Sequence, residues 1–167
     1  MSSVAVMYRS LYDTRPVQEV TSWGSLVQEL QEHLEVKKDK EAGPLWSPVS
    51  LIPGGKRRNA DVVAVNALVV DYDGGTALPD IEGRLKGRDW VAYSTYSHSS
   101  SDPRFHVVVR LPEPITPEKW GEAYCSLRKD LGLDQGDHLP AACHSYFRPQ
   151  HRPGSEFFVR VSEGGVK

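Results

Sequence analysis

The sequence contains few cysteines and no long hydrophobic run. Its two cysteines, Cys125 and Cys143, form no CxxC pair and cannot build a disulfide framework, so we expect reduced thiols. No apolar stretch approaches the roughly 20 residues that a membrane-spanning helix needs. The N-terminus lacks the basic start and long apolar segment of a signal peptide. These absences predict a cytoplasmic protein with no membrane association.

The chain also lacks a strong charge of one sign, internal repeats and low-complexity tracts. A formal net charge of −2 argues against a general nucleic-acid coat protein but leaves room for a local basic groove. The fractions of hydrophobic (39%) and charged (25%) residues are ordinary for a globular protein, and 167 residues suit one domain. We therefore expect a single domain over residues 1–167.

The most informative stretch is Ala67 to Gly75, where four apolar residues precede Asp71-Tyr72-Asp73 and a pair of glycines. This pattern predicts a buried strand that ends in a turn. Alternate residues of a strand share a face, so Asp71 and Asp73 would lie together, with Tyr72 opposite. Such carboxylates suit Mg²⁺ or Mn²⁺ bound together with substrate phosphates. The alternative is two solvated acids at an ordinary strand end, which is favoured for an isolated Asp-x-Asp.

The segment from Pro44 to Asn59 is interpreted as a loop. It ends in Lys56-Arg57-Arg58 after two glycines, and guanidinium groups bind phosphate oxygens in bidentate fashion. A solvated surface turn is an equally good interpretation of this stretch alone. Trp46, placed in this loop, is the best candidate for stacking on a base.

The region from Trp90 to Leu111 predicts a hairpin with a longer loop, in which His98 and Arg104 flank the turn and face the carboxylates. His98 has an alternative role as a hydrogen-bonded turn residue. His106, on the apolar second strand, is interpreted as a histidine satisfied beside the sheet. Helices are expected from Thr21 and from Thr116-Pro117, where a capping residue precedes an amphipathic pattern.

The order of these motifs resembles the catalytic domain of the archaeo-eukaryotic primase (AEP) superfamily, in particular the primase-polymerases of phages and plasmids. The similarity extends from about Thr21 to Gly154 and includes the final Phe-Arg-Pro. It implies an α+β fold: a small antiparallel or mixed sheet of the RNA-recognition-motif (RRM) type with flanking helices. An N-terminal α/β part would cover about residues 1–60, and a metal-binding, RRM-like part about 61–167.

The resemblance also implies roles for individual residues. Asp71 and Asp73 match the first motif, and Ser97-His98 matches the second, whose histidine contacts nucleotide phosphates. The third motif supplies another metal-binding acid, which we assign to Asp137, with Asp134 in reserve. Two Mg²⁺ or Mn²⁺ ions would be held by the three acids. The nucleotide would be bound by His98, Ser97, Arg104, Arg57 and Arg58, and the nucleic acid by Lys56, Arg58 and Trp46.

The function that the resemblance implies is a DNA primase or primase-polymerase, a nucleotidyltransferase that makes primers on single-stranded DNA from NTPs or dNTPs. It would act in the replication of a phage, plasmid or other mobile element, with a helicase domain or protein as a further partner. Two alternatives remain open: a metal-dependent nuclease or phosphotransferase, and a catalytically inactive nucleic-acid-binding module. Zinc is not expected, because His138, Cys143, His144 and His151 match no standard zinc module.

Overall fold

A five-stranded antiparallel sheet organises the molecule. The computed structural model describes residues 3–37, 39–133 and 140–162. The elements are β1 (Ala5–Tyr8), β2 (Gln18–Val20), α1 (Trp23–Gln31), β3 (Leu34–Glu35), η1 (Lys40–Ala42), β4 (Leu45–Ser47), β5 (Val49–Leu51), η2 (Asn59–Asp61), β6 (Val62–Asp73), α2 (Leu78–Glu82), η3 (Gly83–Leu85), β7 (Trp90–Ser94), β8 (Arg104–Ile115), α3 (Pro117–Asp130), β9 (Tyr146–Phe147), β10 (Gln150–His151) and β11 (Val159–Val161). The α+β class implied by the resemblance is confirmed.

The central sheet has the order β11-β7-β8-β6-β5. Its longest strands, β6 and β8, are rich in valine, a β-branched residue that packs well on a pleated surface. They pair with each other, and β7 pairs with the other edge of β8. The predicted strand before Asp71 and the predicted hairpin from Trp90 to Leu111 are therefore both confirmed.

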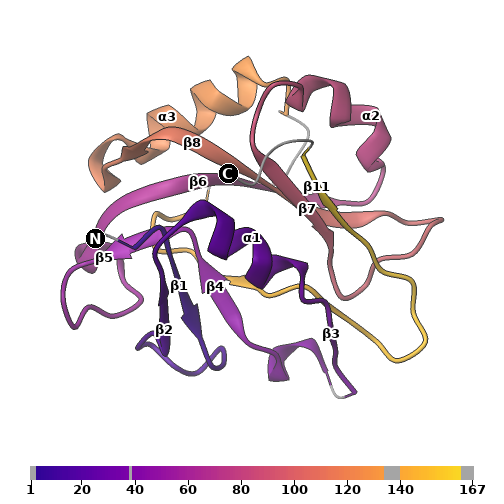
Figure 1. Cartoon of the computed structure of the whole chain (residues 1–167), viewed down its shortest axis with the longest axis horizontal. Coiled ribbons are helices and arrows are strands. Elements are labelled where there is room, and N and C mark those ends of the chain that lie inside the picture. Colours follow the sequence, from indigo (N-terminus) through magenta and orange to yellow (C-terminus); the bar gives the residue numbers. More distant parts are fainter. Residues whose placement is uncertain (1–2, 38, 134–139, 163–167) are drawn as a thin grey trace.

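The two faces of β6 belong to two different cores. Leu68, Val70 and Tyr72 pack in the core that includes residues of α2 and α3. Ala67 and Val69 pack in the core that includes residues of α1, β1 and β4. Figure 1 shows these helices on opposite sides of the sheet. Asp71 and Asp73 continue the face of Ala67 and Val69, so the expected alternation with Tyr72 is confirmed.

A second sheet, ordered β2-β1-β4-β9, and a short parallel pair, β10 and β3, complete the fold. Helix α1 buries Trp23, Leu26, Val27 and Leu30, and Ser22 caps it by accepting a hydrogen bond from the Ser25 backbone N–H at 3.1 Å. Helix α3 begins at Pro117 as expected. Strand β5 joins the central sheet and β9 joins the second sheet, so both halves of the sequence contribute to both sheets. Among the described residues, no helix is long and apolar enough to cross a membrane.

The segment from Pro44 to Asn59 is not a loop throughout, because it contains β4 and β5. Trp46 lies in β4, is 0% exposed, and donates a hydrogen bond from Nε1 to the Tyr93 hydroxyl at 2.9 Å. A side chain enclosed in the core cannot stack on a solvent-borne base. The prediction of a stacking role for Trp46 is therefore wrong, and the residue is part of the core.

Candidate active site

Three polar residues form a row across the central sheet. Cross-strand pairing places His106 of β8 opposite Asp71 of β6 on one side and opposite Tyr93 of β7 on the other. The His106 Nε2 lies 3.3 Å from Asp71 Oδ1, and its Nδ1 lies 2.9 Å from the Tyr93 hydroxyl. Trp46 donates to that same hydroxyl from its indole Nε1. The row therefore connects a half-buried carboxylate to a buried indole through an imidazole and a phenol.

This row determines the charge of Asp71. Burial, the largest single effect, opposes ionisation of the carboxyl, but the hydrogen bond and charge of His106 together with the charges of His144 and Arg104 outweigh it. The pKa of Asp71 is therefore below its usual value. Burial raises the pKa of Tyr93 far above its usual value, so its hydroxyl stays protonated. At neutral pH, Asp71 is an anionic oxygen donor held in a fixed orientation.

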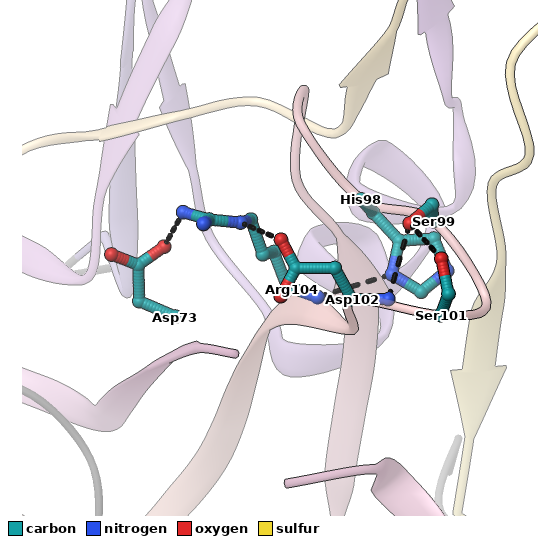
Figure 2. Close-up of polar contacts among 6 residues, drawn as sticks. All are labelled: Asp73, His98, Ser99, Ser101, Asp102 and Arg104. Atoms are coloured by element: carbon teal, nitrogen blue, oxygen red, sulfur yellow. Dashed lines mark hydrogen bonds and ion pairs between the residues drawn. The ribbon is translucent and has the colours of Figure 1, made fainter. Parts of the chain in front are cut away.

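Asp73, two residues further along β6, contacts Arg104 at the start of β8 (Figure 2). The Arg104 Nη1 donates to Asp73 Oδ1, and its Nε donates to Asp102 Oδ2 at 3.0 Å. The hydrogen bond to Asp102 and the charges of both carboxylates raise the pKa of Arg104 above its usual value. The guanidinium is thus placed between two acids at the end of the β6–β8 ladder.

His98 supports the turn rather than facing the carboxylates. Its Nδ1 accepts a hydrogen bond from the Arg104 backbone N–H at 3.1 Å (Figure 2), and its ring packs edge-on against Phe158. Burial lowers the pKa of His98. The alternative interpretation, a hydrogen-bonded turn residue, describes this geometry. The neighbouring Ser97 lines the cavity described next, as does Tyr96.

A cavity of about 250 Å³ opens beside Asp71 and Asp73. Its walls combine the two acids with cationic, hydroxyl and amide side chains: Lys40, Asp71, Asp73, Tyr93, Thr95, Tyr96, Ser97, Arg104, His106, Phe147, Arg148 and Gln150. Sequence reasoning missed Lys40, His106, Arg148 and Gln150. These residues lie on separate elements, and only the folded chain brings them together.

Arg148 and Gln150 each present a buried polar atom with no hydrogen-bond partner. The Arg148 Nη2 donates to the backbone oxygen of Glu29 at 3.1 Å and to its carboxylate at 2.8 Å, while Nε is unpartnered. Gln150 donates from Nε2 to the Lys40 backbone oxygen at 3.1 Å, while Oε1 is unpartnered. Arg148 is thus anchored to α1, and Gln150 to η1, at the wall of the cavity.

The basic segment Lys56-Arg57-Arg58 does not line this cavity. Arg57 donates to the backbone oxygen of Leu11 at 2.6 Å and lies over the Tyr8 ring at 5.3 Å from its centroid. Arg58 forms an ion pair with Asp61 at 2.9 Å. The expected contacts of Arg57 and Arg58 with a nucleotide next to Asp71 are therefore not supported by their placement.

The donor set at Asp71 and Asp73 fits a hard divalent cation. Both provide carboxylate oxygens on one face of β6, and such ligands suit Mg²⁺ or Mn²⁺. Asp137 and Asp134, the candidates for the third acid, lie outside the described residues. Within the part of the chain that the structure describes, no three His, Cys, Asp or Glu residues gather in a metal-binding group.

Comparison with known proteins finds a similar fold and a matching family. A structural match is the AEP domain of the primase-polymerase (PrimPol) of cyanophage S-2L, with a TM-score of 0.54, 13% identity, and coverage of 99% of this chain and 83% of that chain. At this identity the likeness shows the fold, which confirms the AEP-type architecture. No curated protein matches the sequence.

A family model described as the VapE N-terminal domain matches residues 49–164, well over half of the chain. The chain therefore belongs to the VapE N-terminal domain family.

Proposed function

We propose that this chain is the catalytic domain of a primase-polymerase that adds nucleotides to primers on single-stranded DNA during replication of a phage, plasmid or other mobile element. One observation carries the proposal: Asp71 and Asp73 share a cavity with three cationic side chains, Arg104, Arg148 and Lys40. Carboxylates beside cations suit a metal-bound triphosphate, because the acids bind the metal and the cations bind the phosphates. The AEP-type fold and the family membership support the same reaction class.

Asp71 and Asp73 would hold the Mg²⁺ or Mn²⁺ ions. Such ions, when bound, activate the attacking hydroxyl and neutralise the charge of the leaving pyrophosphate. His106 keeps the Asp71 carboxylate ionised and correctly oriented, since its Nε2 contacts one carboxylate oxygen and leaves the other for a ligand. Tyr93 fixes the His106 ring through Nδ1.

Arg104 and Arg148 would bind the triphosphate from two sides. Arg104 contacts Asp73 and Asp102, and phosphate oxygens can take the place of Asp73 on its guanidinium. Arg148 lines the same cavity, and its bond from Nη2 to Glu29 holds the positive guanidinium in place there. Ser97 and Lys40 add a hydroxyl and an ammonium group to the same wall. This arrangement would bind the phosphates beside the end of β6, where the two acids lie.

The proposal is tested by extension of a labelled primer annealed to a DNA template, with NTPs or dNTPs and Mg²⁺ or Mn²⁺. We expect the wild type to extend the primer and Asp71→Asn and Asp73→Asn to reduce the rate by about 100-fold or more. Asp130→Asn is the matched control, because Asp130 is an exposed acid at the end of α3 that lines none of the cavities described here. It should extend the primer at the wild-type rate.

Two outcomes would overturn the proposal. The first is a folded wild-type protein that extends no primer with either metal. The second is full activity in Asp71→Asn. Primer shortening without nucleotide, lost in Asp71→Asn, would establish a metal-dependent nuclease in its place.

A further inference from the structure

A second groove leads away from the carboxylates. It has a volume of about 560 Å³ and shares Asp71, His106 and Phe147 with the first cavity. It is also lined by Leu11, which belongs to the loop between β1 and β2. We call residues 9–17 the hairpin loop; Figure 1 shows it at the tip of the β1–β2 pair. The groove therefore joins the candidate active site to the hairpin loop.

The hairpin loop exposes one aromatic ring and two positive charges. Tyr12 is 83% exposed. Arg9 and Arg15 are exposed as well, and neither forms an ion pair with any acid that the structure describes. The loop's single acid, Asp13, accepts a hydrogen bond from Ser10. In a protein whose formal net charge is −2, this is a local concentration of positive charge.

The hairpin loop is held in shape by hydrogen bonds rather than by a hydrophobic core. The Asp13 backbone N–H donates to the Ser10 oxygen at 3.1 Å, and the Arg57 backbone N–H donates to the Thr14 oxygen at 2.8 Å. The Arg57 guanidinium donates to the Leu11 oxygen and covers the Tyr8 ring. The basic residue nearest the loop thus both braces it and adds a positive charge beside it.

An exposed ring between arginines fits single-stranded nucleic acid. Single strands are bound by aromatic rings that stack on bases and by cations that track the phosphates. A duplex offers no free base face to an exposed ring, so a single strand is the occupant that uses both the ring and the charges. The groove connects that loop with Asp71, since Leu11 and Asp71 both line it.

We propose that the hairpin loop and Arg57 form the docking surface for single-stranded DNA. This proposal rests on the proposed function, because the bound strand would run along the groove to Asp71. Tyr12 stacks on a base, and Arg9 and Arg15 bind the phosphates on either side of it. Arg57 holds the loop in the binding conformation. Trp46, first considered for the stacking role, is replaced by Tyr12.

The test is fluorescence anisotropy of a labelled oligothymidine, titrated without nucleotide or metal over a range of salt concentrations. Tyr12→Ala should weaken binding by about tenfold, and Tyr12→Phe, which keeps the stacking face, should bind like the wild type. The double variant Arg9→Ala/Arg15→Ala should reduce the slope of log affinity against log salt by about 1.4, because each lost single-strand phosphate contact removes about 0.7.

The matched control is Lys86→Ala/Arg88→Ala, which removes two exposed positive charges just after η3 that form no ion pair with an acid in the described residues. It should leave the salt slope unchanged. Equal weakening by the control pair, unchanged binding in Tyr12→Ala, or a wild type that prefers duplex DNA would each overturn the proposal.

This binding assay separates the docking surface from the chemistry. Loss of DNA binding in the hairpin-loop variants of a protein that extends no primer would support the docking surface and reject the proposed function. Primer extension by a protein whose DNA binding is insensitive to Tyr12, Arg9 and Arg15 would support the function and reject the docking surface. Thermal unfolding of each variant checks that the fold is intact.

Discussion

Asp71 and His106 face each other across the β6–β8 ladder, with 3.3 Å between the carboxylate Oδ1 and the imidazole Nε2. The other ring nitrogen of His106 is bound to Tyr93, so both of its nitrogens have partners. The sequence interpretation of His106 as a histidine whose ring nitrogens have hydrogen-bond partners beside the sheet was therefore accurate. The sequence did not identify Asp71 as one of these partners, and it is this contact that places His106 in the candidate active site.

His106 should control the ionisation of Asp71. In His106→Ala, the hydrogen bond and charge that lower the pKa of Asp71 are removed while its burial remains, so that pKa should rise. The acidic limb of the pH–rate profile for primer extension should then move to higher pH, and the rate at neutral pH should fall by about 10- to 100-fold. A lower rate with an unmoved acidic limb would mean that His106 acts only through packing.

Arg104 should act on nucleotide binding more than on the chemical step. Arg104→Lys replaces a forked guanidinium, which spans Asp73 and Asp102, by a single ammonium group. We expect the KM for the nucleotide to rise by about tenfold, with a smaller change in kcat. Arg110→Lys is the control on the same strand, since Arg110 pairs with Asp89 outside the first cavity. An equal effect of both substitutions would contradict a specific role for Arg104.

The parts of the fold that the sequence predicted are those set by local pattern. A valine-rich run before Asp71 and the aromatic strand from Trp90 depend on neighbouring residues only, as does the Thr116-Pro117 helix start. Trp46 was misplaced because prolines on both sides of Leu45-Trp46-Ser47 indicated a loop, whereas the chain forms a strand there that pairs with β1 and β9.

The candidate site was only half predictable for a related reason. Asp71 and Asp73 are two residues apart in sequence, so their shared face follows from strand geometry alone. His106 reaches Asp71 through cross-strand register, and Arg148 reaches the cavity from beyond β9 through its anchor on Glu29. Register and long-range packing are properties of the whole fold. A histidine within a valine-rich strand was the one local signal that pointed to the missed residue.

Tyr93 should stabilise the protein through its hydroxyl. Tyr93→Phe removes a group that accepts from Trp46 Nε1 and contacts His106 Nδ1, which leaves the indole N–H buried without a partner. An unsatisfied buried donor costs about 1–3 kcal/mol, so urea denaturation should show a lower free energy of unfolding by about that amount. The control is Tyr12→Phe, at a ring that is 83% exposed, which should change stability little. Equal stability of wild type and Tyr93→Phe would contradict the row of hydrogen bonds.

A histidine pair away from the carboxylates should make stability depend on pH. The His33 Nε2 lies 2.9 Å from the Ser94 backbone oxygen, which can only accept, so Nε2 carries the proton. The His33 Nδ1 must then accept from His151 Nδ1, 2.8 Å away. Burial lowers the pKa of His33 from 6.5 to about 4, with the His151 and His98 charges adding to this and the Ser94 bond opposing it. The folded protein therefore requires a neutral His33.

The sign of the pH effect follows from this lowered pKa. Between pH 6.5 and 4 the unfolded chain binds a proton at His33 that the folded chain does not, so the free energy of unfolding should fall as the pH falls through this window. Because the ring is only partly buried, solvent screening reduces the loss of unfolding free energy to about 1–2 kcal/mol.

His33→Gln keeps a side chain that can hydrogen-bond but cannot be protonated, and its stability should decline less over the same pH range in urea titrations. The pKa values of His98 and His144 are also lowered, so some decline should persist in the variant. Identical pH dependence in wild type and His33→Gln would show that the pair contributes nothing.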